Sequence, residues 1–464
     1  MPRTLLALML LLIAFPVAAR EWFVATDGDN TLGDGSKARP FRTVGRVLDT
    51  SIGVIQAGDT VSLRAGTYHE CDVRLRKRMT LRSIPGEHAH IQCDLTVKDS
   101  VVIQIDPEAS GSRIADLEIS GSMYYGIQLQ TAWYRGEGQQ GRGASNVILE
   151  NLKIHDTGRD GIKITPKCDH VTIRRSEIWN TGAADPPGTP LEDRNAEGID
   201  NVGGSFMLVE DNHIHDTATT GVYFKGGASD VIVQRNRIEN TGMSGILVGF
   251  DTSEEYFDLE ANPGYYEAMR AIVRNNLVRY TGYAGIGLYA ARDAVVVNNT
   301  IIDAARLGHA ALYFGIPFQD WDPKAGRPPS TNPLIRNNLL IQDRGTCVEI
   351  RWSRELGGLS ALAGSPNTDF NAYSSHGGDC RFVDMRSSGV LPGSLDFDGW
   401  RRRQSTDAHS VEADITVGSD GTPPAGSAVI DRGAQVDQVS DDLDGRKRTA
   451  PYDIGAVEFV DRPH

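Results

Sequence analysis

The chain has 464 residues, a formal net charge of −14 and only 7% aromatic residues. The acidic balance argues against nucleic acid or an anionic membrane surface as a partner, because both are negatively charged. It does not exclude an acidic polysaccharide, which local Lys and Arg clusters or a bound cation can still attract. The length suits two or three ordinary domains or one long repeat protein.

Residues 1–19 have the pattern of a secretory signal peptide. Arg3 precedes an apolar run at 5–14, and small residues follow up to Ala19. The run is shorter than the roughly 20 residues that a membrane-spanning helix needs. We expect cleavage after Ala19, with an uncleaved anchor helix as the alternative, and no membrane span later in the chain. The mature protein is therefore expected to be secreted or periplasmic.

Residues 20–70 are expected to contain an N-terminal cap and the first strands. Val44, Val47 and Leu48 recur at helical spacing and predict a short amphipathic helix. The segment AGDTVSLRAGTYHE (57–70) then begins a series of short strands. The helix would cover the first strands, whose apolar side chains would otherwise meet water.

Residues 71–345 repeat a theme with a period of about two dozen residues. Short strands rich in Ile and Val alternate with Asn, Asp, Thr and Gly, and one Gly of each unit aligns at Gly161, Gly198, Gly221, Gly245 and Gly285. Three short strands per unit and no helical pattern predict a parallel β-helix, whose stacked coils bury a continuous core. Leucine-rich repeats have a similar period, but their Leu framework is missing.

Three insertions interrupt the repeat, at 132–143, 183–195 and 251–268. Long loops on one face of a solenoid usually carry binding function, so we expect these three to wall a groove. Residues 346–464 are expected to form the last coils and a C-terminal closing segment, because this part is polar and ends in a short strand.

Small polar residues at the strand ends predict a ladder of turns. Asp156, Asn180, Asp216 and Asn240 take equivalent positions in successive units, and Asp and Asn tolerate left-handed backbone geometry. His155 and His215 precede two of these positions and are assigned a structural role.

The chain has five cysteines, an odd number that argues against a disulfide scaffold. Cys71 and Cys93 are one unit apart and are expected to stack. This spacing permits a disulfide between them but does not require one.

Alignment on the Gly column also predicts which side chains face solvent. Side chains alternate along a strand, so the residue after each Gly points inward and the next points outward. In three neighbouring coils the outward positions, together with the position before Gly, hold a strip of reactive residues: Asp160, Lys163, Glu197, Asp200, Tyr223 and Lys225. The alternative interpretation is a set of ordinary ion pairs between coils.

The opening and closing segments carry a resemblance to a known superfamily. FVATDGDNTLGDGSKARPFRTVGRVLD (23–49), AGDTVSLRAGTYHE and the tail motif DDLDGRK...YDIGAVEF are similar to segments of exported polysaccharide lyases and related bacterial proteins. The sequence resembles the right-handed parallel β-helix proteins of the pectin-lyase-like superfamily. This resemblance implies an all-β, right-handed parallel β-helix with an N-terminal cap helix and a C-terminal closing segment. The fold hosts lyases, hydrolases, epimerases and adhesins, so it does not fix the reaction.

Two motifs resemble those of calcium-dependent family nine pectate lyases. AEGID is similar to their DDGxD-type calcium motif, with Glu197 and Asp200 matching its second and third acids and Ala196 in place of the first. Asp160, one coil earlier, would supply a further oxygen ligand for Ca²⁺. VYFKGG resembles the coil that carries the catalytic Lys in these lyases. The resemblance implies Lys225 as the base, and Lys163 is the second candidate.

These residues suit β-elimination on a uronate-containing polysaccharide. A base removes the weakly acidic C5 proton, and a cation stabilises the negative charge that develops next to the carboxylate. A Lys beside a cation can have its pKa lowered far enough to act as this base. The expected partner is an acidic polysaccharide, and the protein is expected to be a monomer. Tyr223, Trp133 and Tyr134 are candidate sugar-binding residues, although an insertion tip could equally pack on the solenoid.

Two other functions stay open. Asp160, Glu197 and Asp200 could serve an inverting glycoside hydrolase without metal. However, the acidic, GHG and RIK motifs of polygalacturonases and the DPHE-type motif of mannuronan epimerases are missing, and His309 is a poor substitute for the GHG histidine. The third possibility is a non-catalytic carbohydrate-binding solenoid.

Overall fold

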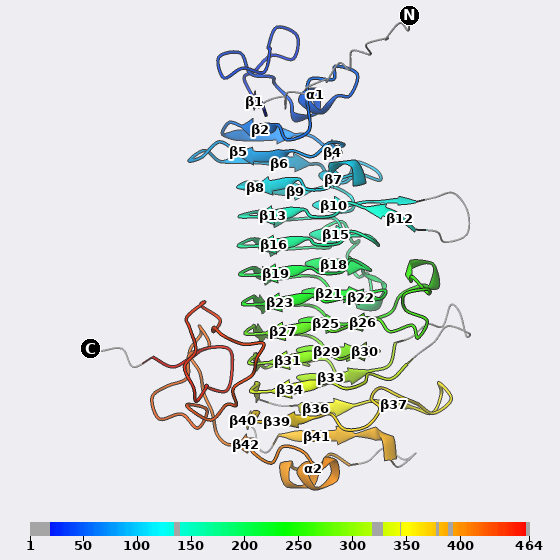
Figure 1. Ribbon diagram of the computed structural model, residues 1–464, viewed down its shortest axis with the longest axis vertical. Coiled ribbons are helices and arrows are strands. Elements are labelled where there is room, and N and C mark those ends of the chain that lie inside the picture. Colours follow the sequence, from blue (N-terminus) through cyan, green and yellow to red (C-terminus); the bar gives the residue numbers. More distant parts are fainter. Residues whose placement is uncertain are drawn as a thin grey trace, which may run out of the picture.

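The computed structural model describes residues 19–133, 140–317, 328–343, 345–376, 380–387 and 393–460. In this part of the chain, three long parallel sheets run along a stack of coils, as the parallel β-helix prediction requires (Figure 1). After β2, each coil adds one strand to each of these sheets, so strands that are consecutive within a coil lie in different sheets.

The first sheet contains β1 (Glu21–Val24), β2 (Thr60–Leu63), β5 (Thr80–Ser83), β8 (Arg113–Ala115), β13 (Ile148–Glu150), β16 (Thr172–Arg174), β19 (Leu208–Glu210), β23 (Ile232–Gln234), β27 (Ile272–Arg274), β31 (Val295–Val297), β34 (Leu334–Arg336) and β39 (Thr368–Asp369). The second contains β4 (Val73–Leu75), β7 (Ile103–Ile105), β10 (Ile127–Leu129), β15 (Ile162–Ile164), β18 (Ile199–Val202), β21 (Val222–Lys225), β25 (Ile246–Val248), β29 (Ile286–Tyr289), β33 (Leu312–Gly315), β36 (Thr346–Ile350) and β41 (Arg381–Asp384). The third contains β3 (Gly66–His69), β6 (Ala89–Cys93), β9 (Leu117–Gly121), β14 (Lys153–His155), β17 (Glu177–Trp179), β20 (His213–His215), β24 (Arg237–Glu239), β28 (Leu277–Arg279), β32 (Thr300–Ile302), β35 (Leu339–Gln342), β40 (Ala372–Ser375) and β42 (Val411–Glu412).

The remaining elements are short. Three further small sheets are formed by β11 (Thr131–Trp133) with β12 (Gln140–Gly143), by β22 (Ala228–Ser229), β26 (Ala268–Met269) and β30 (Ala291–Arg292), and by β37 (Trp352–Ser353) with β38 (Leu359–Ser360). The helices are α1 (Val44–Leu48), α2 (Phe397–Gln404) and the 3-10 turns η1 (Pro107–Ala109), η2 (Leu191–Asp193), η3 (Glu254–Tyr256) and η4 (Met385–Ser387). No helix within the described ranges is long and apolar enough to cross a membrane.

The glycine column has the register that the sequence predicts. Ile162 pairs with Ile199, which pairs with Val222, and all three are buried in the core. A Cβ at Gly161 would lie 2.8 Å from the carbonyl oxygen of Gly198, and one at Gly198 would lie 2.6 Å from that of Gly221. Only glycine therefore lets neighbouring coils approach this closely.

Two ladders of polar residues shape the turns. Asp156, Asn180, Asp216 and Asn240 all have positive φ, which confirms the predicted turn ladder. A second ladder, which the sequence did not indicate, is buried in the turn between the first and third sheets. Its members accept a hydrogen bond from the backbone of the preceding coil and donate to other buried carbonyl groups; they are Asn212, Asn236, Asn276, Asn299, Asn338 and Asn371.

The predicted N-terminal helix is present as α1. The hydroxyl of Thr43 accepts from the N–H of Arg46 at its N-terminus, and Val44, Val47 and Leu48 are buried. The Glu70 carboxylate also accepts from two N–H groups of its first turn.

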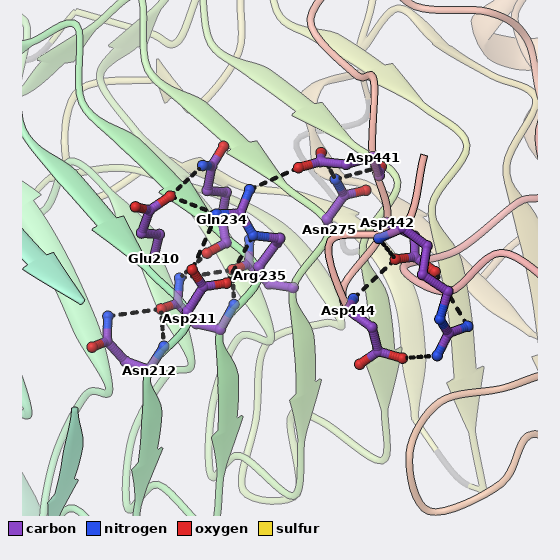
Figure 2. A network of polar contacts seen from close by, with 12 residues as sticks. Glu210, Asp211, Asn212, Gln234, Arg235, Asn275, Asp441, Asp442 and Asp444 are labelled. Carbon is purple, nitrogen blue, oxygen red and sulfur yellow. Dashed lines mark hydrogen bonds and ion pairs between the residues drawn. The ribbon is translucent and has the colours of Figure 1, made fainter. Parts of the chain in front are cut away.

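The C-terminal segment, residues 418–460, lies alongside the coils rather than beyond the last one (Figure 1). Figure 2 shows one attachment, in which Arg235 binds Glu210 and Asp211 of the coils and Asp441 of this segment. The Asn275 amide also donates to Asp441. That α1 and this segment protect the core of the stack stays a prediction.

The cysteines form two disulfides, Cys71–Cys93 and Cys347–Cys380, and Cys168 is free and buried. The first bond settles the pairing that the sequence left open. The second joins residues 33 positions apart, a separation that does not match the repeat period.

Candidate functional site

The predicted strip lies on the outer side of the second sheet, on the consecutive strands β15, β18 and β21. Lys163 pairs in register with Asp200, and Asp200 with Tyr223; Val202 pairs with Lys225. The parallel register thus places the outward positions of three coils side by side, as the alternation of side chains predicts. All six predicted residues of the strip come from these strands or the positions just before them.

Side chains of the strip line a hollow of about 420 Å³. Its walls include Lys163, Tyr223 and Lys225 from the strands, Asn195 from the insertion 183–195 and Tyr256 from the insertion 251–268. The expectation that insertions wall a groove is therefore confirmed for these two.

Three carboxylates meet at the base of the strip. Asp160, Glu197 and Asp200 each offer one oxygen within 4.8 Å of the others. Asp160 and Asp200 are fully buried, and Glu197 is 5% exposed. Buried carboxylates this close together repel one another and lack water, so hydrogen-bond donors or cations must stabilise them.

Part of this compensation comes from hydrogen bonds. Asp160 Oδ1 accepts from the backbone N–H of Glu197 at 3.1 Å. The Asn195 amide, oriented with its nitrogen toward the acids, donates to Glu197 Oε2 and Asp160 Oδ1, both at 3.0 Å. Burial raises the pKa of Asp160 well above its usual range, and burial followed by the charge of Asp200 raises the pKa of Glu197.

Lys163 supplies a positive charge to the same cluster. Its ammonium group contacts Asp200 directly and lies 3.7 Å from Asp160 Oδ2. Burial lowers the pKa of Lys163, but Asp200 and Asp160 outweigh burial and leave that pKa above its ordinary value. Lys163 therefore stays protonated, which favours a role as a fixed charge over a role as base.

Lys225 has different surroundings. The residue is half-buried, and its Nζ lies 4.5 Å from the ring centroid of Tyr223 and 5.5 Å from that of Phe250. Among the described residues, no carboxylate lies within ion-pair distance of this ammonium group. Of the two lysines, Lys225 is thus the one available to a bound substrate.

The acid cluster fits a hard divalent cation. Asp160 Oδ2 and Asp200 Oδ1 are buried and have no hydrogen-bond partner among the described residues. The three carboxylates with Lys163 would carry a net charge of −2 when ionised, and Ca²⁺ prefers carboxylate and carbonyl oxygens. Asp160 brings a third carboxylate to Glu197 and Asp200, where Ala196 has none to offer.

The predicted sugar-binding residues lie in different places. Tyr223 lines the hollow but is only 3% exposed, because it packs with Leu247 and Tyr289. Burial raises the pKa of Tyr223, with further contributions from the nearby carboxylates, so the phenol is neutral. Tyr134 and the side chain of Trp133 lie outside the described residues, and their role stays a prediction.

A second hollow, of about 600 Å³, continues the first along the same sheet, and Asp251 borders both. Its walls carry aromatic and charged side chains that were not predicted: Phe250, Tyr283, Tyr289, His309, Tyr313, Glu349 and Arg351. The imidazole of His309 stacks on Tyr313 with ring centroids 4.0 Å apart. The sequence signal that could have identified these residues is the column of outward positions that runs from Tyr223 to Tyr313.

Comparison with known proteins agrees with the architecture. A family described as "Right handed beta helix region" matches residues 101–262. The structure resembles that of pectate lyase Pel9A, with a TM-score of 0.57 and 12% identity over 96% of this chain and 97% of that one. It also resembles XylC in its complex with xylose, with a TM-score of 0.50 and 12% identity over 95% and 98% of the two chains. No curated protein matches the sequence. The chain thus has the right-handed parallel β-helix fold, which confirms the resemblance to pectin-lyase-like proteins at the level of the fold.

Proposed function

We propose that this chain is an exported polysaccharide lyase that cleaves a uronate-containing polysaccharide by β-elimination with the help of Ca²⁺. The observation that carries the proposal is the grouping of one oxygen each of Asp160, Glu197 and Asp200 within 4.8 Å. These buried acids lie on the strip whose residues Lys163 and Lys225 line the hollow. The likeness of the fold to a pectate lyase supports the proposal, although at 12% identity this likeness concerns the fold alone.

In this mechanism Lys225 is the base. Its amine takes the proton from C5 of the uronate, the C4–O bond breaks, and the leaving sugar oxygen takes a proton from water, which leaves a double bond between C4 and C5. Bound Ca²⁺ would neutralise the uronate carboxylate and so make the C5 proton more acidic. Asp160, Glu197 and Asp200 would hold the cation, and Lys163 and Asn195 would hold the acids in place.

The carboxylate spacing favours elimination over inverting hydrolysis. An inverting glycosidase keeps its two carboxyl groups about 6.5 to 9.5 Å apart so that a water molecule fits between sugar and base. Here one oxygen of each acid lies within 4.8 Å of one oxygen of each of the other two. Their burial and shared partners suit joint cation binding better than separate acid and base roles.

Other parts of the proposal concern the whole protein. We propose that residues 1–19 direct export, that the protein acts as a monomer on an acidic polysaccharide, and that α1 and the C-terminal segment shield the core of the coil stack. The lysines of the strip, and a cation held by its acids, would attract a charged carbohydrate even though the chain is acidic overall.

A substrate screen tests this function. Acidic polysaccharides are incubated with the protein in the presence of Ca²⁺ or of a chelator, and the ultraviolet absorbance of unsaturated uronate ends is followed. We expect absorbance to rise with at least one substrate and only when Ca²⁺ is present. New reducing ends without this absorbance would indicate a hydrolase, and saturable binding without any product would indicate a carbohydrate-binding protein.

A further inference from the structure

The outer side of the third sheet carries a cluster of histidines that the proposed lyase mechanism does not use. Glu177 of β17 pairs in register with His213 of β20, and Trp179 pairs with His215. Glu177 Oε1 lies 3.8 Å from His213 Nδ1 and 3.5 Å from His215 Nε2. Two imidazole nitrogens therefore converge on one carboxylate oxygen, and the three atoms lie within 4.8 Å of one another.

The other nitrogen of each imidazole is held by a further carboxylate. His215 Nδ1 hydrogen-bonds to Asp216 Oδ2 at 2.7 Å, and His213 Nε2 to Glu239 Oε1 at 2.8 Å. His215 Nε2 is buried and has no hydrogen-bond partner among the described residues. A carboxylate behind each imidazole is the usual support of a metal-binding histidine, because it fixes both the ring and its tautomer.

A similar arrangement, with a serine hydroxyl in place of one supporting carboxylate, occurs in the preceding coils. Glu118 Oε1 of β9 lies 3.5 Å from His90 Nδ1 of β6 and 3.2 Å from His155 Nε2 of β14. Asp156 holds His155 Nδ1 at 2.6 Å, and Ser120 holds His90 Nε2 at 2.8 Å. These three ligand atoms also lie within 4.8 Å of one another.

Trp179 lies between the two clusters. Its ring stacks on His155 with centroids 4.3 Å apart, and the His215 ring lies nearly parallel to it at 5.9 Å. Stacking alone would explain why these rings are parallel. It does not explain why both histidines of each cluster direct a nitrogen to one Glu while a separate oxygen holds the opposite nitrogen.

We propose that these clusters are two binding sites for a divalent transition-metal ion, with Zn²⁺ as the test ion. Each offers two imidazoles and one carboxylate, a ligand set that suits Zn²⁺, Ni²⁺ or Cu²⁺ rather than the Ca²⁺ proposed for the second sheet. The Glu177 side chain is 41% exposed and that of His155 14%, so ions can reach both sites from solvent. With three protein ligands, each ion would keep a position for water.

Binding stoichiometry on the full chain without an affinity tag provides the test. With Ca²⁺ in excess to fill the site proposed on the second sheet, titration calorimetry with Zn²⁺ is expected to give two ions per chain for the natural protein. His215→Ala and His155→Ala should each leave one ion, and the double variant none. The control is His409→Ala, because His409 also pairs with a carboxylate (Asp369, 2.9 Å) and stacks on an aromatic ring, yet belongs to neither cluster.

Two further measurements separate metal binding from structural damage. Glu177→Gln keeps the size of the side chain but removes its charge, so it should weaken one of the two binding events while leaving the unfolding temperature without metal unchanged. Cu²⁺ should quench the fluorescence of Trp179, and Trp179→Phe should remove that part of the quenching. The proposal is overturned if no saturable Zn²⁺ binding occurs, or if the stoichiometry is the same in the His155 and His215 variants as in the natural protein.

Discussion

Three buried carboxylates within 4.8 Å repel one another strongly when all are charged. Here Lys163 balances part of the charge, and burial raises the pKa of Asp160 and of Glu197 so that protons can balance the rest. A divalent cation would replace those protons. Asp160 Oδ2 and Asp200 Oδ1 accept no hydrogen bond from the described residues, so the cluster has unused binding capacity at these two oxygens.

The first prediction concerns Asp200. Asp200→Asn keeps the shape of the side chain but removes a charge from the proposed cation site. Because the number of charged ligands sets Ca²⁺ affinity, we expect the Ca²⁺ concentration for half-maximal lyase activity to rise at least about tenfold. Asp193→Asn, an exposed change in the insertion 183–195, is the control and should leave this Ca²⁺ concentration unaltered. Equal Ca²⁺ requirements in the two variants would contradict the cation site.

The second prediction concerns His309 and pH. Burial and the charge of Arg351 lower its pKa from the ordinary 6.5 to about 4. Because the unfolded chain takes up this proton at higher pH than the folded one, the contribution of His309 to stability is present above pH 6.5 and is lost as the pH falls toward 4. Urea unfolding at several pH values should show that the free energy of unfolding falls less steeply over this interval for His309→Gln than for the natural protein. The same dependence of this free energy on pH in both proteins would refute the lowered pKa of His309.

At the scale of strands and turns, each coil is joined to the next by side chains as well as by backbone. The Asn236 side chain donates to the Val209 carbonyl and to Asn276, and accepts from the Asn212 N–H. All these groups are buried, so the ladder replaces water as their hydrogen-bond partner.

The third prediction therefore concerns Asn236. Asn236→Ala leaves buried donors and acceptors of two coils without partners, each at a cost of about 1–3 kcal/mol. We expect the free energy of unfolding to fall by about 2–4 kcal/mol in a denaturant titration. The exposed change Lys153→Ala should alter it little. A loss below about 0.5 kcal/mol for Asn236→Ala would show that water or a shift of the backbone satisfies these groups.

At this scale the sequence predicts the register of the strands but not the contacts of their side chains, for a physical reason. Glycine spacing and the alternation along strands were enough to place Lys163, Asp200 and Tyr223 in one register. The spacing of residues does not predict contacts that depend on side-chain rotamers. The assignment of His155 and His215 to turns alone, for instance, gave no sign that each meets a glutamate on a neighbouring coil.

At the scale of the molecule, a segment far along the chain is fastened to the middle of the coil stack. Arg448 is buried, and its guanidinium donates to Glu458 at 2.7 Å, to the Gly455 carbonyl at 2.8 Å and to Asn275 of the coils at 3.2 Å. In a solenoid, stability is nearly a sum over neighbouring units, so damage in one place tends to stay local.

The fourth prediction follows from this fastening. Arg448→Ala leaves Glu458 buried without its partner, which typically costs about 3–5 kcal/mol. We expect protease cleavage within 418–460 to become faster, while the coils stay resistant. Arg402→Ala on the exposed side of α2 should cleave like the natural protein. If Arg448→Ala instead made the coils as sensitive as the segment, the two parts would form a single cooperative unit.

The central claim is that Lys225 removes the C5 proton at the acid cluster. The most direct measurement is the initial rate of absorbance from unsaturated uronate ends, with Ca²⁺ and the best substrate of the screen, for Lys225→Ala and for Lys153→Ala. Loss of a general base typically slows a reaction about 100- to 10,000-fold, so Lys225→Ala should fall by such a factor while Lys153→Ala keeps the natural rate. A Lys225→Ala protein that is folded and forms product at the natural rate would contradict the account.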